Sequence, residues 1–184
     1  SPFNDPGSTN AASFSLGRKV YIADCSATGG TCTLTQALKI ANAAAGQSGA
    51  GLLVVNGNLR ITNNLQYISS VVTDLRQLAS LAVVVRGNLE IENEVANVIG
   101  AYYVEGTVFT TPTSTATSSD NRYPLTVRGL MIAKGFEFNR KFAGTVESPL
   151  PSELFIFDGR LQSNPLPGMT DFAGALPDTF NSSP

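Results

Sequence analysis

The stretch Val54-Val55-Asn56-Gly57-Asn58-Leu59-Arg60-Ile61 returns thirty residues later as Val84-Val85-Arg86-Gly87-Asn88-Leu89-Glu90-Ile91. Shorter versions of the same phrase surround three further glycines, and the successive intervals are 30, 19, 23 and 30 residues. A unit that keeps its pattern while its spacing varies indicates stacked rungs joined by loops of different length. The sequence therefore predicts a solenoid whose rung glycines are Gly57, Gly87, Gly106, Gly129 and Gly159.

The apolar residues within each copy share one side of a strand, because successive side chains of a strand alternate between its two faces. They are predicted to face the core and include Val55, Leu59, Ile61, Val85, Leu89, Ile91, Val104, Val108, Val127, Met131 and Ala133. The opposite side carries polar and charged residues, so Arg60 is expected to face Glu90 on the neighbouring rung. The same stacking predicts an outer column of Asn56, Arg86, Glu105, Arg128 and Asp158.

Composition limits the function classes. The chain has 184 residues, of which 42% are hydrophobic and only 14% charged, against roughly 25% charged in ordinary soluble domains. This is the profile of a single β-rich surface domain rather than of a cytosolic enzyme. The net charge is -2 with no basic run, which argues against nucleic acid as a partner. No apolar run approaches the roughly 18 residues of a membrane span.

The chain contains no histidine, which removes Ser-His and Cys-His catalysis and the commonest transition-metal ligand. The two cysteines, Cys25 and Cys32, enclose a short loop rich in Gly, Ser and Thr. They form either a disulfide or two free thiols, because a metal site needs about four ligands. We predict the disulfide and, with it, an extracellular or cell-surface location. No cofactor or metal is predicted.

One helix is expected, over residues 34–45. Thr33 and Gln36 fit a capping box, alanines dominate the segment, and Gly46 is placed to end it. The predicted organisation is a single domain. It consists of an extended arm over 1–18, a strand, the Cys loop and the cap helix over 19–50, rungs over 51–162, and a C-terminal packing segment over 163–184.

Two stretches resemble known proteins. The segment Cys32-Thr-Leu-Thr-Gln-Ala-Leu-Lys-Ile-Ala-Asn42 resembles the C-[ST]-L-R-E-A-I-x-x-A-N opening of secreted right-handed parallel β-helix proteins, with Thr35-Gln36 in place of Arg-Glu. In that family a helix at this position caps the first rung. The stretch from Leu75 to Arg140, and Pro151-Ser152-Glu153 after it, resembles uncharacterised surface proteins of candidate-phyla bacteria. These resemblances imply an all-β, right-handed parallel β-helix with one N-terminal capping α-helix.

Three groups of residues could form functional sites, and each also has a structural interpretation. Glu90, Glu92 and Glu94 alternate along one predicted strand, roughly 6.5–7 Å apart, within the range of paired catalytic carboxylates. A solvated charge ladder, in which Arg60 neutralises Glu90, is the favoured interpretation. The rung glycines precede no helix and no Lys-Ser/Thr pair, so they indicate close stacking rather than phosphate loops. Four aromatic residues could form a sugar-stacking platform: Tyr102, Tyr103, Phe136 and Phe138. The alternate spacing of Phe136 and Phe138 favours the core for that pair.

The sequence favours a non-enzymatic, extracellular structural protein that self-assembles with copies of itself into a surface filament or layer. Open strand edges at the ends of a solenoid must be capped or paired with another copy. An adhesin or glycan-binding module with surface glycans as partners is the alternative. A polysaccharide lyase or hydrolase is the second alternative, and it requires the carboxylates to line a groove.

Overall fold

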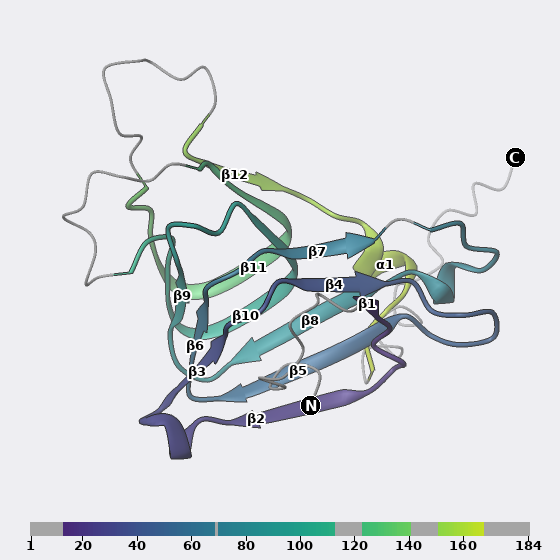
Figure 1. Cartoon of the computed structure of the whole chain (residues 1–184), viewed down its shortest axis with the longest axis horizontal. Helices are drawn as coiled ribbons and strands as arrows, with labels where there is room; N and C mark the ends of the chain where they lie inside the picture. The colour runs from purple at the N-terminus through teal and green to yellow at the C-terminus, as the bar shows by residue number, and fades with distance from the viewer. Residues whose placement is uncertain (1–12, 69, 113–122, 141–150, 168–184) are drawn as a thin grey trace, which may run out of the picture.

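The protein folds as a parallel β-solenoid of about four turns in a computed structural model that describes residues 13–68, 70–112, 123–140 and 151–167 (Figure 1). Every strand pair among these residues is parallel, and successive turns of the coil lie side by side. The prediction of a parallel β-solenoid is therefore confirmed.

The strands line three faces of the coil. The first face stacks β2 (Val20–Asp24), β5 (Ala50–Asn56), β8 (Ser80–Val85) and the first parts of β10 (Asn97–Phe109) and β11 (Leu125–Glu137). The second stacks β3 (Thr31–Leu34), β6 (Asn58–Ile61), β9 (Leu89–Ile91) and the remainder of β10 and β11. The third stacks β1 (Ser13–Phe14), β4 (Leu38–Ala41) and β7 (Leu65–Ile68).

Three short helices and one further strand complete the described chain. The 3-10 turns are η1 (Ser26–Thr28) and η2 (Leu75–Gln77), and α1 (Arg160–Ser163) follows the last strand. That strand, β12 (Glu153–Ile156), pairs with the beginning of β11 only. No helix in the described part is long and apolar enough to cross a bilayer.

The core lies inside the coil and is built by alternation. The predicted inward residues of the first two copies are at most 1% exposed: Val55, Leu59, Ile61, Val85, Leu89 and Ile91. Complete burial of each aliphatic side chain stabilises the fold by about 1.5–3 kcal/mol. Val104, Val108 and Val127 follow the same rule, and Met131 and Ala133 pack partly buried against this core.

The glycines of the repeated phrase stack at the corner between the first and second faces, but only in part as predicted. The amide of Gly87 donates to the carbonyl of Gly57 at 3.0 Å, and Gly106 donates to Gly87 at 3.0 Å. A Cβ on Gly87 would lie 2.3 Å from Asn58 Oδ1, so the column needs glycine for close approach. The column begins at Gly30, which lies beneath Gly57. Gly30 was not among the glycines predicted from the repeated phrase.

Two of the predicted rung glycines do not belong to this column. Gly129 pairs with Gly100 rather than Gly106, because β10 and β11 pair from their first residues and shift register only after Val104. Gly159 lies outside any strand and precedes α1, with open space where its Cβ would be. The predicted outer column is therefore wrong beyond Glu105, since Arg128 lies beside Ile99 and Asp158 follows β12.

An amide ladder runs beside the glycine column and explains the asparagine of the repeated phrase. Asn58 Oδ1 accepts the backbone N–H of Asn88 at 2.9 Å, and Asn88 Oδ1 accepts that of Thr107 at 2.9 Å. Below them, Asn58 Nδ2 donates to Thr31 Oγ1 at 3.4 Å. Each side chain thus satisfies a backbone group that the turn would otherwise leave unpaired, which fixes the register of one rung on the next.

The predicted cap helix over residues 34–45 is wrong. Residues 31–34 and 38–41 form β3 and β4, which pair in register with β6 and β7. Leu38 and Ile40 are buried two residues apart, a strand spacing, and the alanines beyond them form a turn at Gly46. Helix propensity is a weak preference that tertiary pairing overrides. The segment that resembles the cap of secreted β-helix proteins is part of the first turn of the coil.

The segments at both ends of the coil pack against it. Within the predicted arm, Leu16 is completely buried and β1 pairs with β4. Within the predicted C-terminal segment, Leu166 is buried, and Asn164 Nδ2 donates to the carbonyls of Arg76 and Leu78 at 2.8 and 2.7 Å. Residues 1–12 and 168–184 lie outside the described part of the chain.

Candidate functional site

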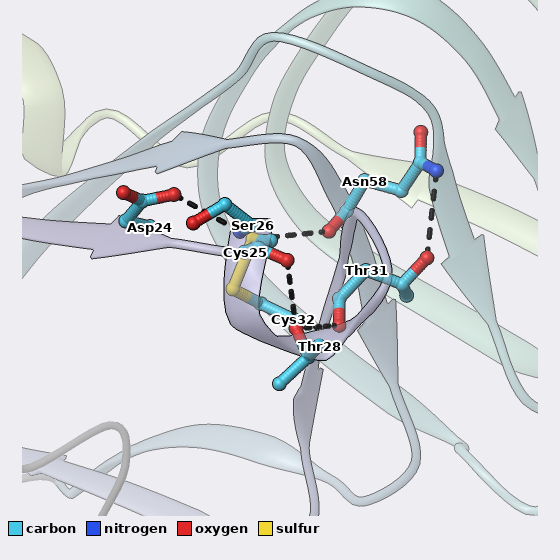
Figure 2. The surroundings of a disulfide bond; sticks show 7 residues. All are labelled: Asp24, Cys25, Ser26, Thr28, Thr31, Cys32 and Asn58. Atoms are coloured by element: carbon cyan, nitrogen blue, oxygen red, sulfur yellow. Dashed lines mark hydrogen bonds between the residues drawn. A yellow bond between two sulfur atoms is a disulfide. The ribbon is translucent and has the colours of Figure 1, made fainter.

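The predicted disulfide joins Cys25 to Cys32 at the first corner of the coil, with a Cα–Cα distance of 5.1 Å (Figure 2). Thr28 Oγ1 donates to the carbonyl of Cys25 and closes the loop between them. Cys25 is completely buried, and a Cβ on Gly57 would lie 2.9 Å from the Cys25 Cβ. The bridge therefore supports the base of the glycine column, and it is consistent with a location outside the cytoplasm.

The carboxylate candidates form a charge ladder with Arg60. Arg60 Nε lies 2.7 Å from Glu92 Oε1 and 3.5 Å from Glu90 Oε2, and Arg60 and Glu90 are register partners as predicted. Arg60 Nε makes no hydrogen bond in this geometry, so the attraction is ionic. Glu94 takes part in no ion pair with the described residues. The structure thus joins two of the three carboxylates to one cation, and the described residues contain no cluster of three metal-ligating side chains.

The aromatic candidates separate into one buried and several exposed rings. Tyr102 is 2% exposed, whereas its neighbour Tyr103 points outward. Phe136 and Phe138 are exposed and stacked with ring centroids 5.6 Å apart, and Phe155 meets Phe138 edge-on at 5.8 Å. The interpretation of the phenylalanine pair as core is wrong, because β11 is the last strand on this part of the second face in the described chain.

A buried arginine ties three turns of the coil together. The Arg140 guanidinium donates to the carbonyls of Thr110 at 2.8 Å, Tyr123 at 3.1 Å and Glu92 at 2.7 Å. Glu153 Oε1 accepts the Arg140 backbone N–H at 3.1 Å. Burial lowers the pKa of Arg140 to about 10, which Glu153 partly opposes. Arg140 therefore remains charged at neutral pH, and its contacts mark a structural role that no sequence pattern indicated.

The outer side of the first face is apolar along its whole height. Two columns of side chains alternate with the buried ones, and strand register aligns them from turn to turn. We call them the apolar columns. One comprises Val20, Leu52, Ala82, Ala101 and Leu130, and the other Ile22, Val54, Val84, Tyr103 and Ile132. They contain no charged residue, so the predicted solvent-facing polar residues occupy only part of this outer side.

Exposure is greatest at the two ends of the apolar columns. Ile22 is 68% exposed on the first turn, and Tyr103 and Ile132 are 51% and 52% exposed on the last two. Taking rungs ~4.8 Å apart and side chains ~7 Å apart along each strand, the columns cover roughly 300 Å². Ala82, in the middle of the first column, is buried. A patch of this size equals the largest apolar patch of a typical soluble monomer, and such a patch is often functional.

A charged column borders the apolar columns at the corner of the coil. Asp24 and Asn56 are register partners, and the residues one position beyond the last paired residues of the next strands continue the column: Arg86, Glu105 and Lys134. Lys134 lies at the irregularity where the register of β10 and β11 shifts. The backbone N–H of Ser26 donates to Asp24 Oδ1 at 3.0 Å and is the main cause that lowers the pKa of this exposed carboxyl. The column thus has a negative charge at the first turn and a positive charge at the last.

A cleft of about 530 Å³ opens where the third face meets the first. Its walls come from β7, the start of β10, Arg128 of β11 and the segment that leads from β12 into α1. The Arg160 guanidinium lies 4.6 Å from the centre of the Tyr67 ring, and its Nε lies 3.3 Å from Asp158 Oδ2. The cleft was not predicted from the sequence, because its residues come from segments far apart in the chain; Arg128, Asp158 and Gly159 were singled out, but for other roles.

The cleft contains a tyrosine with a strongly shifted pKa. Burial raises the pKa of Tyr67 to about 12; the N–H of Leu81, which donates to its hydroxyl at 2.9 Å, acts in the opposite direction. Nearby charges have smaller effects, with Asp158 raising and Arg160 lowering the pKa. Burial also raises the pKa of Tyr102. Tyr67 is therefore a neutral hydrogen-bonding group at physiological pH.

These shifts predict a loss of stability in alkali. An unfolded tyrosine loses its proton near pH 10.0, whereas folded Tyr67 keeps it to about 12, so the unfolded state binds fewer protons in this window. The free energy of unfolding should be unaffected below pH 10 and then fall by about 1.4 kcal/mol per pH unit for this group. Denaturant unfolding of the wild type and Tyr67→Phe checks this. A slope that the substitution leaves unchanged would contradict it.

Comparison with protein-family models, with curated proteins and with solved structures finds no match to this chain.

Proposed function

We propose that this protein is a non-enzymatic, extracellular structural subunit that self-assembles, and that the apolar columns form the contact between copies. The observation that carries the proposal is the uninterrupted apolar outer side of the first face. Burying it against a second copy removes exposed aliphatic surface from water, at about 25 cal/mol per Å². The charged column would then form part of the polar rim that surrounds the apolar centre of most protein interfaces.

Charge complementarity favours a second copy as the occupant. In a two-fold dimer whose axis lies along the strands, the coils run antiparallel and the same columns face each other. Asp24 on the first turn of one copy then faces Lys134 on the last turn of its partner, and the pair occurs twice. In the same arrangement Ile22 meets Ile132. The same axis places Arg86 opposite Arg86 at the centre, one unfavourable contact against the two Asp24–Lys134 pairs. A two-fold axis along the coil would instead place the charged columns at opposite edges of the contact, where they could not pair.

Strand pairing at the ends of the coil would join such dimers into a larger assembly. Within the described ranges no strand pairs with the outer edges of β2 and β3, or with the second half of β11 beyond its β10 partner. Open edges accept further strands from other chains. We also propose a right-handed coil, because parallel strands joined by crossovers in one sheet wind that way almost without exception. A filament or layer built of antiparallel pairs follows from both contacts.

Sedimentation equilibrium of the intact chain tests the proposal. We expect dimers or larger species, and we expect Ile22→Lys and Ile132→Lys each to weaken association at least tenfold by placing a charge in the apolar contact. Val71→Lys is the matched control, because Val71 is 98% exposed outside the columns. Variants that associate as tightly as the control, or a wild type that stays monomeric at high concentration, would refute the assignment.

A charge exchange tests the antiparallel arrangement. Asp24→Lys alone should weaken the dimer a few-fold, consistent with exposed ion pairs of about 0.2–1 kcal/mol each. The double variant Asp24→Lys, Lys134→Asp restores opposite charges across the contact and should recover the affinity. If the double variant is weaker than the single one, the coils do not pair in this orientation.

A further inference from the structure

The cleft between β7 and the segment after β12 contains a cation that makes no ion pair with the described residues. Arg128 lines it, and no carboxylate in the described chain lies within ion-pair distance of its guanidinium. Arg128 lies beside Ile99 on β10 and Ile156 on β12, so both neighbouring strands present apolar side chains to it. Arg128 is itself exposed, so its planar fork is accessible to a carboxylate from outside the protein.

The carboxylate of Asp158 does not prevent the cleft from binding an anion. Asp158 lies 3.3 Å from Arg160 Nε through Oδ2, and its Oδ1 accepts the backbone N–H of Arg160 at 3.1 Å. Its charge is thus largely balanced, while its oxygens retain the capacity to accept hydrogen bonds from hydroxyl groups. Arg160 is in turn held over the Tyr67 ring. Arg128, Asp158 and Arg160 together contribute one net positive charge to the cleft.

The remaining lining suits a polyhydroxylated ring. The side-chain amides of Gln66 and Asn97 make no hydrogen bond to any described residue, so both can donate to and accept from hydroxyl groups. Phe157 is 63% exposed at the cleft and offers an aromatic face to the C–H side of a sugar. The volume of about 530 Å³ exceeds that of a single sugar ring and falls within the range of ligand pockets.

We propose that this cleft binds an acidic oligosaccharide, with the carboxylate of one sugar on Arg128, its hydroxyl groups on Asp158, Gln66 and Asn97, and a ring face on Phe157. The ligand class is a glycan that carries carboxylate groups, as uronic acids do. The residues of this site are not members of the apolar columns, and the site gives the proposed structural subunit a means of attachment to a charged polysaccharide.

Isothermal titration of the intact protein with a galacturonate trisaccharide tests the site, with the neutral galactose trisaccharide as the uncharged probe. We expect the acidic sugar to bind and the neutral one to bind at least tenfold more weakly, since hydrogen bonds to a charged group are worth more than neutral ones. Arg128→Gln should reduce the affinity for the acidic sugar at least tenfold. Phe157→Ala should reduce the affinity for both sugars.

Arg86→Gln is the control, because Arg86 is an exposed arginine outside the cleft with no ion pair to a described residue. It should bind the acidic trisaccharide as the wild type does. Equal affinity of Arg128→Gln and Arg86→Gln, equal binding of the charged and neutral sugars, or no binding of the acidic sugar would each overturn the proposal. Sedimentation of Arg128→Gln should match the wild type, so a failure of this site is distinguishable from a failure of assembly.

Discussion

Replacing Arg140 with leucine is expected to lower the free energy of unfolding by about 3–5 kcal/mol, the range for breaking a buried charged network. Arg140 is 4% exposed, and its guanidinium donates to three carbonyls that lie on different turns of the coil. Leucine would leave these acceptors without their donors in a site from which water is largely excluded. Each buried unsatisfied group costs about 1–3 kcal/mol.

Chemical denaturation followed by circular dichroism measures this loss. Arg140→Lys should be intermediate, because one ammonium group retains the charge but cannot reproduce the fork that reaches three carbonyls. Arg86→Leu is the control at an exposed position and should change stability by less than about 0.5 kcal/mol. If Arg140→Leu and Arg86→Leu are equally stable, the buried arginine does not hold the turns together.

Gly129→Ala is expected to be the most damaging of the glycine substitutions. Gly129 has φ of 149°, which side chains other than glycine rarely adopt, and an added Cβ would lie 1.9 Å from the carbonyl oxygen of Gly100. That neighbour is backbone and cannot move aside as a flexible side chain would. Backbone strain costs about 1–3 kcal/mol and forced displacement in a packed interior a further 1–3 kcal/mol.

Gly159→Ala provides the matched comparison. Gly159 belongs to the same repeated phrase in the sequence, yet it precedes α1, has φ of -72° and would have no atom within 4 Å of an added Cβ. Its substitution should cost about 0.5–1 kcal/mol, because glycine is preferred over alanine at a helix N-cap but no steric clash is added. Thermal unfolding of the two variants distinguishes them, and equal melting temperatures would mean that Gly129 does not stack on Gly100.

The alternation of apolar residues predicted which side chains form the core. The variable length of the loops prevented a correct prediction of which strands are neighbours. Val55, Leu59 and Ile61 were correctly assigned inward because a strand fixes the side of each side chain, and Arg60 was correctly paired with Glu90 because their copies match residue for residue. The phrase around Gly129 has the same local pattern but a different register, which only the pairing of β10 with β11 decides. A short repeated sequence pattern therefore predicts where a strand lies more reliably than it predicts which residues that strand pairs with.

The errors share one physical cause, the dominance of tertiary pairing over local signals. Within the predicted helix, Leu34 and residues 38–41 lie in strands, because they pair with β6 and β7 and because Leu38 and Ile40 are buried in the core. Likewise, the apolar columns were hidden in the sequence, because Leu52 and Val54 simply read as parts of a continuous apolar run. The cleft was inaccessible to sequence reasoning, since Tyr67, Arg128 and Arg160 meet only in the folded coil.

Footprinting of two tyrosines tests the assembly contact most directly. Tyr103 lies in an apolar column and Tyr123 outside it, and they are 51% and 48% exposed, so they provide chemically matched probes within one chain. Hydroxyl-radical labelling of the intact protein, read by mass spectrometry, should modify both equally at dilutions where the copies separate. At concentrations where they associate, Tyr103 should become severalfold less reactive while Tyr123 is unchanged. A Tyr103 that stays as reactive as Tyr123 in the associated protein would contradict the contact through the apolar columns.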